Sequence, residues 1–355
     1  MRFTLRPRAA VAITSVTRLL LALLCVSGVS SRGSELIENI AFGSCLNRTE
    51  HPLLDRTLTL PMQIFIFMGD NIYGDSTDMA VLRQKYDALK TSAFFQKLKA
   101  QAHVLATWDD HDFGANDAGA EYPKRWESRE EFFRWIDEPV ASARREREGV
   151  HDAQIFGPEG KRVQVILLDT RFSRSPLRQL PNGEQPLLGG PYLPSTDRSA
   201  TMLGEAQWRW LENELRKPAE VRLMVSSIQF VSEFSGAEAW ANLPHEKERM
   251  LALIAQTKAR GVIFLSGDRH WCELSKMDGP AGRPLYDLTA SAMTVPHKRG
   301  TPTENKFRAL PLTYHDVNVG HLHIDWAQTD PVLTLKIIDV SGAARLEHRV
   351  QLSGL

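Results

Sequence analysis

The sequence predicts a layered α/β fold, in which short buried strands alternate with amphipathic helices. Residues 64–68 (IFIFM) form an almost wholly apolar run of β-branched and aromatic residues. Such a run is typical of a strand buried on both faces of a mostly parallel sheet. Comparable runs occur at residues 163–168 and 261–266, and polar residues follow each of them. Open α/β sheets bind their ligands at the carboxyl ends of such strands, so these polar residues are candidates for a site.

Seven strands are predicted before the carboxyl-terminal segment, each from a short apolar run bounded by polar or turn-forming residues. In chain order they cover residues 40–42, 64–68, 102–107, 163–168, 221–225, 261–266 and 285–292. Residues 321–327 and 332–340 predict a terminal hairpin.

Helices are predicted where apolar residues recur three or four positions apart, as Leu82, Tyr86 and Leu89 do. The four predicted helices cover residues 79–99, 129–147, 204–217 and 246–260. Residues 174–202 contain five prolines and predict a long irregular loop, and residues 294–319 predict a second one. Loops of this length in compact domains are lids, binding segments or disordered.

The composition is that of an ordinary globular protein, with 43% hydrophobic and 24% charged residues in a chain of 355. Forty-three basic residues balance forty-three acidic ones, so no nucleic-acid-binding surface is expected. No linker long enough to separate two domains interrupts the pattern. We therefore expect a single domain over residues 31–355.

The amino terminus predicts a secretory signal peptide over about residues 1–30. Three arginines in the first eight residues precede an apolar run at residues 19–25 and small residues at 26–30. Arg18 interrupts the apolar segment and leaves it too short to span a membrane. The mature chain is expected to be secreted or periplasmic, without a transmembrane segment.

Polar and metal-ligating residues follow five of the predicted strands. They are Cys45; Asp70, Asn71 and Tyr73; Asp109, Asp110, His111 and Asp112; Gln229; and Asp268 and His270. Because the ends of adjacent parallel strands meet at one edge, these side chains predict a metal centre. Asp70 is the best candidate for a carboxylate shared by two ions, which suits displacement at phosphorus.

Structural explanations compete with this interpretation at several positions. Tyr73 could simply pack its ring in the core. Asp169 and Arg171 are interpreted slightly more readily as a structural ion pair than as substrate contacts. Gln229 is equally consistent with support of the ligands and with packing at a strand end. Four further histidines match no ligand pattern and are interpreted as structural: His297, His315, His321 and His323.

Other catalytic classes fit less well. The sequence contains no G-x-S-x-G elbow, no G-x-x-x-x-G-K-[ST] phosphate loop and no G-x-G-x-x-G fingerprint. A cysteine hydrolase that uses Cys45 and a remote histidine is possible, but it leaves Asp70, Asp110 and Asp268 without a role. Beyond the predicted leader only Cys45 and Cys272 remain, and they could form a disulfide or leave Cys45 as a metal ligand.

The motifs and their order resemble the alkaline phosphatase D family, which comprises phosphatases and phosphodiesterases of the calcineurin-like metallophosphoesterase fold. The resemblance covers residues 40–293 and rests on GSC, GDNIYGD, TWDDHDFGAND, LLDTR, LGEAQWRWLENEL, SSIQF and GDRHW. It implies a four-layer α/β/β/α sandwich. The amino-terminal β-sandwich domain that many members carry is not expected here.

The resemblance also implies a centre of one ferric ion and calcium. Cys45, Asp70 and Tyr73 correspond to iron ligands, His270 joins them, and Asp70 bridges to the second site. On the calcium side the implied ligands are Asp110 and Asp268, with Asn116 as a weaker candidate; oxygen donors are what calcium prefers. His111 resembles the histidine that contacts the phosphate or protonates the leaving group. Residues expected to contact substrate or to support the ligands are Asn71, Asp109, Gln229 and Arg269.

The predicted function is therefore that of a secreted, metal-dependent phosphoric ester hydrolase acting on a small-molecule ester. His111 and Asp70 are the predicted catalytic residues, and a metal-activated water attacks phosphorus in line. Monoesters and diesters both remain open as substrates. The alternatives are a non-catalytic calcium-binding protein of the same fold and a cysteine hydrolase, and metal analysis of the purified protein distinguishes them. The resemblance favours Cys45 as a ligand and Cys272 as a free, buried thiol.

Overall fold

A computed structural model describes residues 1–2, 4, 35–182, 184, 190–297 and 304–355 of the chain. The predicted signal peptide lies almost entirely outside these described residues. The chain divides into two units, Met1–Arg32 and Gly33–Leu355, and the helices and strands of the described residues all belong to the second unit.

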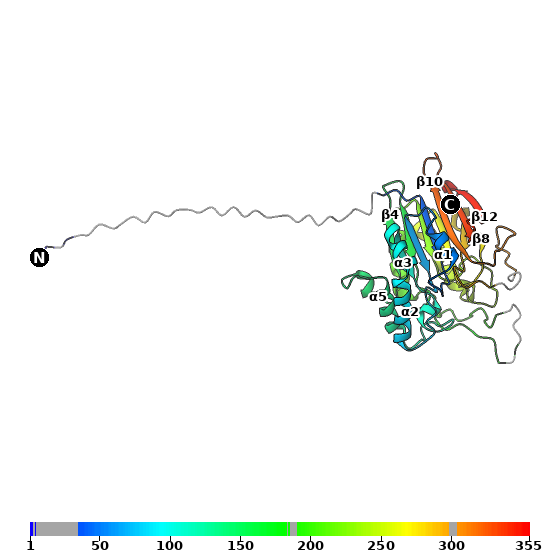
Figure 1. The fold of residues 1–355 in the computed structure, drawn as a ribbon, viewed down its shortest axis with the longest axis horizontal. Helices are drawn as coiled ribbons and strands as arrows, with labels where there is room; N and C mark the ends of the chain where they lie inside the picture. Colours follow the sequence, from blue (N-terminus) through cyan, green and yellow to red (C-terminus); the bar gives the residue numbers. More distant parts are fainter. Residues whose placement is uncertain (3, 5–34, 183, 185–189, 298–303) are drawn as a thin grey trace. The chain divides into compact units, whose positions relative to one another are not determined.

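Two six-stranded sheets form the centre of this second unit (Figure 1). The strands of the first sheet are, in spatial order, β12 (Ala344–Gln351), β11 (Val332–Asp339), β10 (Asn318–Asp325), β1 (Asn39–Gly43), β2 (Ile64–Met68) and β3 (His103–Thr107). β1, β2 and β3 are parallel, whereas β10, β11 and β12 form an antiparallel extension beside β1.

The second sheet has a parallel centre and two antiparallel edges. Its strands are, in spatial order, β4 (Asp152–Phe156), β5 (Val163–Leu167), β6 (Val221–Val225), β7 (Val262–Ser266), β9 (Pro284–Thr289) and β8 (Glu273–Asp278). Only β4 and β8 run opposite to their neighbours.

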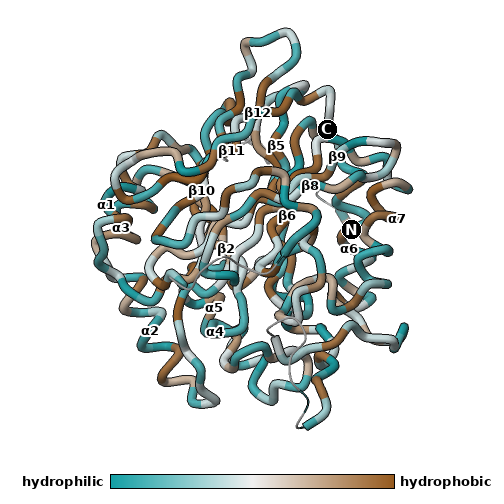
Figure 2. The backbone as a smooth tube through the Cα atoms, turned by 90° about the vertical axis from the view of Figure 1, so that its right-hand side faces the viewer, coloured by the Kyte–Doolittle hydropathy of each residue, from teal (hydrophilic) through white to brown (hydrophobic). Residues whose placement is uncertain are grey.

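Helices cover the outer faces of the two sheets. On the side of the first sheet lie α1 (Pro52–Thr57), α2 (Met79–Thr91), α3 (Ala93–Gln101), α4 (Asp110–Phe113) and α5 (Arg125–Trp135). Figure 2 shows these on one side and α6 (Gly204–Leu215) and α7 (Pro244–Thr257) on the other. Short 3₁₀ helices occur at Ala143–Glu146, Trp240–Asn242, Pro280–Gly282 and Leu352–Gly354. The predicted four-layer α/β/β/α sandwich is confirmed.

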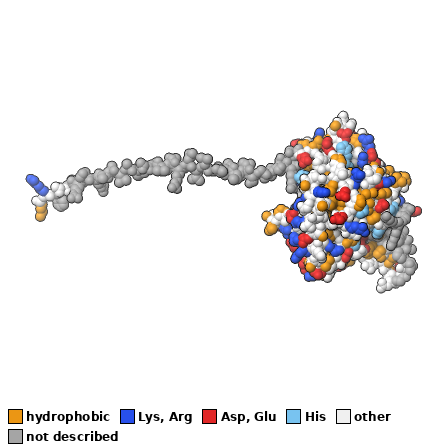
Figure 3. All heavy atoms as spheres, in the orientation of Figure 1, with side chains coloured by type: hydrophobic (Ala, Val, Ile, Leu, Met, Phe, Trp, Pro, Cys, Tyr) orange, Lys and Arg blue, Asp and Glu red, His pale blue; other side chains and the backbone are white. Residues whose placement is uncertain are grey.

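Charged side chains of both signs are intermixed on the face of this unit that Figure 3 shows. This mixture agrees with the equal numbers of basic and acidic residues in the sequence. An electrostatic preference for a charged ligand must therefore come from local groups on this face rather than from a broad surface of one sign.

β2 shows how the apolar strands hold the layers together. Ile64, Ile66 and Met68 pack into the core between the sheets, whereas Phe65 and Phe67 pack against the helices. Successive side chains of a strand point to opposite faces, so an uninterrupted apolar run fills two cores at once. All five residues are fully buried, as the sequence predicts.

Two helix predictions were wrong in their bounds. The predicted helix over residues 79–99 is two helices, because Ser92 ends α2 and its hydroxyl caps α3 through the amide of Phe95. The helix predicted over residues 129–147 starts earlier, at Arg125, and ends at Trp135. Pro139 lacks the amide that a continuing helix needs, which is consistent with this end.

The sequence did not predict β4, β8 or β12, and all three are edge strands. These three strands contain partly or fully exposed side chains, so they lack the apolar run by which central strands are recognised. The terminal hairpin is confirmed as β10 and β11. Among the described residues of the two predicted loops, 174–202 contains no helix or strand, and 294–319 contains none before β10 begins at Asn318.

Candidate metal centre

The segments that follow β1, β2, β3 and β7 meet at one edge of the sandwich. The thiol of Cys45 donates to Asp70 Oδ2 at 3.4 Å, and the backbone amide of Leu46 donates to the carbonyl of Asp70 at 2.7 Å. Tyr73 Oη lies 3.4 Å from His270 Nε2. Residues far apart in the chain therefore share one small site, as the sequence predicts.

Three overlapping groups of potential ligands occur among the described residues. Within each group the ligand atoms lie within 4.8 Å of one another. The first group is Cys45, Asp70 and His270, the second is Asp70, Asp110 and His111, and the third is Asp110, Asp117 and Glu238. Asp70 belongs to two groups, which is the position that a bridging carboxylate requires. Asp110 also belongs to two. Asp117 and Glu238 were not predicted from the sequence.

Several of these residues share an uncommon backbone conformation. Cys45, Asp70, Asp117, Asp268 and His270 have positive φ angles of 57°, 51°, 52°, 64° and 59°. A positive φ is rare for residues other than glycine and costs about 1–3 kcal/mol when the side chain is not suited to it. Such residues cluster at functional sites because the backbone is bent there to aim side chains inward. No sequence pattern reveals this conformation.

Gly69 permits the loops after β2 and β3 to approach each other. Its φ is 103°, and a Cβ atom at this position would lie 2.6 Å from Cβ of Asp109. Any larger residue would therefore separate Asp70 from the Asp109–Asp110 pair. This explains why glycine precedes the predicted bridging carboxylate.

The electrostatics of the site fit metal ions. Burial raises the pKa of Asp70 well above its usual value, and the nearby Cys45 and Asp110 raise it further. Burial likewise raises the pKa of the Cys45 thiol. Asp70 Oδ1 and Asn71 Oδ1 are buried and make no hydrogen bond with any described residue. Fully buried carboxylates are costly without counter-charges, so this set of thiol, phenol, imidazole and carboxylate groups suits cations.

Asp112 ties the loop after β2 to the loop after β3. Its carboxylate accepts hydrogen bonds from the backbone amides of Asn71 at 3.0 Å and Asp109 at 3.0 Å. It also accepts one from the hydroxyl of Tyr86 at 3.0 Å. Burial raises the pKa of Asp112 to about 6, although these hydrogen bonds counteract the rise. The run of four polar residues at 109–112 thus includes one that positions the others.

A buried ion-pair network supports the other side of the site. Arg171 is fully buried and donates to Asp109, and it forms a bidentate pair with Glu238 at 2.7 and 2.5 Å. Arg174 Nη2 lies 3.1 Å from the same Glu238 carboxylate. Asp109 also accepts a hydrogen bond from the hydroxyl of Ser227 at 2.7 Å. These contacts hold Asp109 beside Asp110, and its predicted role in supporting the ligands stays a prediction.

The predicted ion pair between Asp169 and Arg171 was wrong. The Asp169 carboxylate accepts the backbone amides of Val150, Arg171 and Phe172 at 2.8–2.9 Å. These amides, two of them from the turn that follows β5, occupy both carboxylate oxygens, and the guanidinium of Arg171 pairs with Asp109 and Glu238 instead. Backbone amides and the Arg171 side chain can compete for the Asp169 carboxylate. The amides bind it here because the backbone already holds them beside it.

His111 is held in a defined orientation at the edge of the site. Its Nδ1 lies 2.6 Å from Asp75 Oδ1, and its ring contacts that of Tyr73 at a tilt of 32°, with centroids 4.1 Å apart. Burial alone would lower the pKa of His111, but Asp75 and Asp110 outweigh it and raise the pKa to about 9. The pairing with Asp75 leaves Nε2 as the nitrogen available to a substrate.

Part of this site lines a cavity of about 340 Å³, called here the metal cavity; Cys45, Asp70 and Tyr73 are not in its lining. Its lining includes Asp110, His111, Asn116, Asp117, Tyr192, Glu238, Asp268, Arg269, His270, Trp271 and His297. Asn116, Asp268 and Arg269 therefore reach the site, although Asp268 belongs to none of the three ligand groups. His297 was interpreted as structural, yet it lines the cavity and stacks on His270 at 4.2 Å.

Two other predicted residues lie apart from the ligands. Gln229 donates to Glu273 at 2.8 Å and to Thr289 at 2.9 Å, so it packs beside β8 and β9. Cys272 is fully buried in the core between the sheets, and neither Cys45 nor Cys272 forms a disulfide. No helix among the described residues has the length and apolarity needed to cross a membrane.

Comparisons with known proteins identify the family and the fold. The family model of the PhoD-like phosphatases matches residues 53–306. The solved structure of PhoD is similar with a TM-score of 0.64 and 15% identity, covering 90% of this chain and 72% of that one. A dimetal phosphatase from Danio rerio is similar with a TM-score of 0.50 and 11% identity, covering 90% and 100%. A search of curated protein sequences found no match.

The two structures are too distant in sequence to show more than the fold. The family model matches most of the chain, from α1 to the second irregular loop, and so includes most of the residues that meet at the metal cavity. The chain belongs to the PhoD-like phosphatase family and is a metallophosphoesterase.

Proposed function

We propose that this phosphoesterase is an exported enzyme that hydrolyses small phosphate esters at a centre of ferric iron and calcium. The observation that carries the proposal is the chain of three ligand groups linked through Asp70 and Asp110. A thiol, a phenol and an imidazole lie at one end, and carboxylates dominate the other. Thiolate and phenolate suit ferric iron, whereas calcium prefers oxygen ligands.

In this proposal Cys45, Asp70, Tyr73 and His270 hold iron. Asp110 and Asp268 hold calcium together with the shared Asp70, and Asn116 is a further candidate. When bound, the ions supply Lewis acidity that activates water and neutralises charge on the phosphoryl oxygens. His111 presents Nε2 to the cavity, where it contacts the phosphoryl group or donates a proton to the leaving oxygen.

Export is proposed from the leader-like residues 1–30, which place the mature chain outside the cytoplasm. Amino-terminal sequencing of the mature protein tests this. Cysteine catalysis is disfavoured by the site, because Cys45 is fully buried and its pKa is raised. A nucleophilic thiol needs both access to its substrate and thiolate character.

Metal removal is expected to abolish hydrolysis. Purified protein should cleave a generic phosphate monoester or diester at neutral to alkaline pH, and a chelator should lower the rate by at least about 100-fold. Restoring iron and calcium should restore the rate. Activity that survives in metal-free protein would contradict the proposal, whereas a metal-loaded protein with no turnover would support a non-catalytic calcium-binding protein.

Iron ligation by Cys45 predicts a visible colour. Thiolate and phenolate bound to ferric iron give charge-transfer absorption, so Cys45→Ser should weaken the visible band and lower the iron content. Cys272→Ser is the matched control, because this buried thiol lies outside the three ligand groups and should leave the band unchanged. A colourless, iron-free protein with full activity would rule out the iron assignment.

A further inference from the structure

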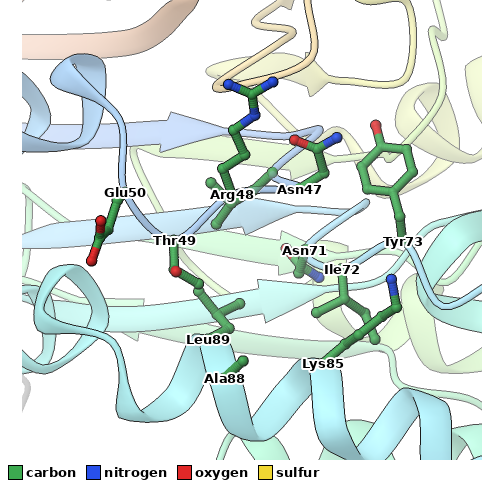
Figure 4. Close-up of a pocket in the computed structure, with 11 residues that line it drawn as sticks. Asn47, Arg48, Thr49, Glu50, Asn71, Ile72, Tyr73, Lys85, Ala88 and Leu89 are labelled. Carbon is green, nitrogen blue, oxygen red and sulfur yellow. The ribbon is translucent and has the colours of Figure 1, made fainter.

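A second cavity, of about 550 Å³, adjoins the metal centre through Tyr73 (Figure 4). Its walls come from three segments: residues 46–50 after β1, residues 71–73 after β2, and α2 through Lys85, Ala88 and Leu89. The second of these segments starts one residue after Asp70, and consecutive Cα atoms are about 3.8 Å apart. The second cavity thus begins directly beside the residue that links the two metal groups.

Tyr73 separates the two cavities. It lines the second cavity, and its ring contacts that of His111, which lines the metal cavity. The Tyr73 side chain is only partly buried. The two cavities therefore lie on either side of the Tyr73–His111 pair.

The charges of the two cavities are opposite in character. The metal cavity contains Asp110, Asp117, Glu238 and Asp268, which suit cations. In the second cavity Arg48 and Lys85 come from separate elements, and neither makes a hydrogen bond or ion pair with any described residue. Figure 4 shows Lys85 extending from α2 toward Tyr73.

The remaining lining residues are compatible with an anion beside Tyr73. Glu50 is the acidic residue of the lining, and Figure 4 shows it at the end of the cavity away from Tyr73. Asn71 donates through Nδ2 to the carbonyl of Thr107 at 2.8 Å, which leaves its buried Oδ1 without a hydrogen-bond partner among the described residues. This oxygen can accept a hydrogen bond from a hydroxyl group of a ligand.

We propose that the second cavity binds a second phosphate group of the substrate, so that the enzyme prefers esters whose alcohol part carries a further phosphate. A guanidinium and an ammonium group are the side chains that bind phosphate best. The chain as a whole carries 43 basic and 43 acidic residues, so this attraction is local to the cavity. The inference rests on the proposed phosphoesterase function.

The test uses a matched series of phosphate esters of alkanediols with about three to eight carbons, a range of lengths chosen from the distance between neighbouring residues. The far end of each alkanediol carries either a hydroxyl or a second phosphate. Each compound is offered as the phosphate monoester and as the methyl diester, and kcat/KM is measured with metal-loaded protein. We expect the phosphate-ended ester to be preferred by about tenfold or more at the chain length that spans the cavities, since a charge-assisted hydrogen bond contributes about 1.5 kcal/mol or more.

The double variant Arg48→Gln, Lys85→Gln should reduce this preference to near unity. The control is the single variant Lys97→Gln, which removes one positive charge from an exposed position of α3 outside the cavity. The control should keep the preference, so a general loss of positive charge can be distinguished from loss of the cavity.

An absent preference in the wild type, or one that the double variant retains, would overturn the inference while leaving the phosphoesterase function intact. Failure to hydrolyse either ester would instead count against the proposed function. In that case, calorimetric binding of the two esters to the metal-loaded protein still tests the cavity. Tighter binding of the phosphate-ended ester that depends on Arg48 and Lys85 supports the inference, and equal binding contradicts it.

Discussion

Asp70→Asn is expected to lower kcat/KM by about 1,000-fold or more while the protein remains folded. Asp70 belongs to two ligand groups, so losing its charge weakens both proposed metal sites at once. A bound metal contributes several kcal/mol of transition-state stabilisation, and each 1.36 kcal/mol corresponds to a factor of about ten in rate. Metal content and hydrolysis of a generic ester are the measurements.

The same substitution should not destabilise the metal-free protein. Asp70 is fully buried, and its pKa is raised by burial and by Cys45 and Asp110, so a neutral side chain removes a cost. The melting temperature of metal-free Asp70→Asn should equal or exceed that of the wild type. Asp55→Asn makes the same chemical change at an exposed position of α1 and should leave activity unchanged. Full activity in Asp70→Asn would exclude Asp70 as the bridge.

Arg171→Met is expected to lower the free energy of unfolding by about 3–5 kcal/mol, because it leaves buried carboxylates without their counter-charge. Arg171 is fully buried and pairs with Asp109 and Glu238. The hydroxyl of Ser227 and the guanidinium of Arg174 compensate only partly. Denaturant unfolding measures the loss, and activity should fall as well because Asp109 adjoins the ligand Asp110.

Arg216→Met is the control for this prediction. Arg216 follows α6 and pairs with Glu212 at 2.5 Å, and its side chain is 50% exposed. Such surface pairs contribute about 0–1 kcal/mol, because water screens them. Equal losses in the two variants would mean that the buried network contributes no more than a surface pair does.

The central strands could be predicted from the sequence because burial on both faces leaves a pattern in the chain. The run at Ile64–Met68 must fill the core between the sheets and the core beneath the helices, and only apolar residues do both. β4, β8 and β12 escaped prediction because partly or fully exposed residues interrupt their apolar pattern, whereas β3, also at an edge, ends in three buried residues. The boundary between α2 and α3 at Ser92 was not predicted, because a serine inside an amphipathic pattern can also be an ordinary surface residue of one continuous helix.

The candidate metal ligands divide in a similar way. Cys45, Asp70, Asp110 and His270 follow buried strands, so strand order alone brings them to one edge. Glu238 lies in a segment between β6 and α7, with no strand directly before it. Its carboxylate reaches the site because Arg171 and Arg174 bind it there, and no pattern in the sequence reports that contact.

The order of residues along the chain was sufficient to predict the layered α/β fold, the edge at which the site forms and the family, because strand burial and ligand-bearing turns are local features. The folded structure was needed to establish which carboxylates share ligand groups, which partners Arg171 takes and which cavity Arg48 and Lys85 line. Those contacts join segments of distant sequence, and their geometry depends on how the two sheets pack and on the left-handed turns at Asp70 and Asp268. Sequence spacing records neither of these.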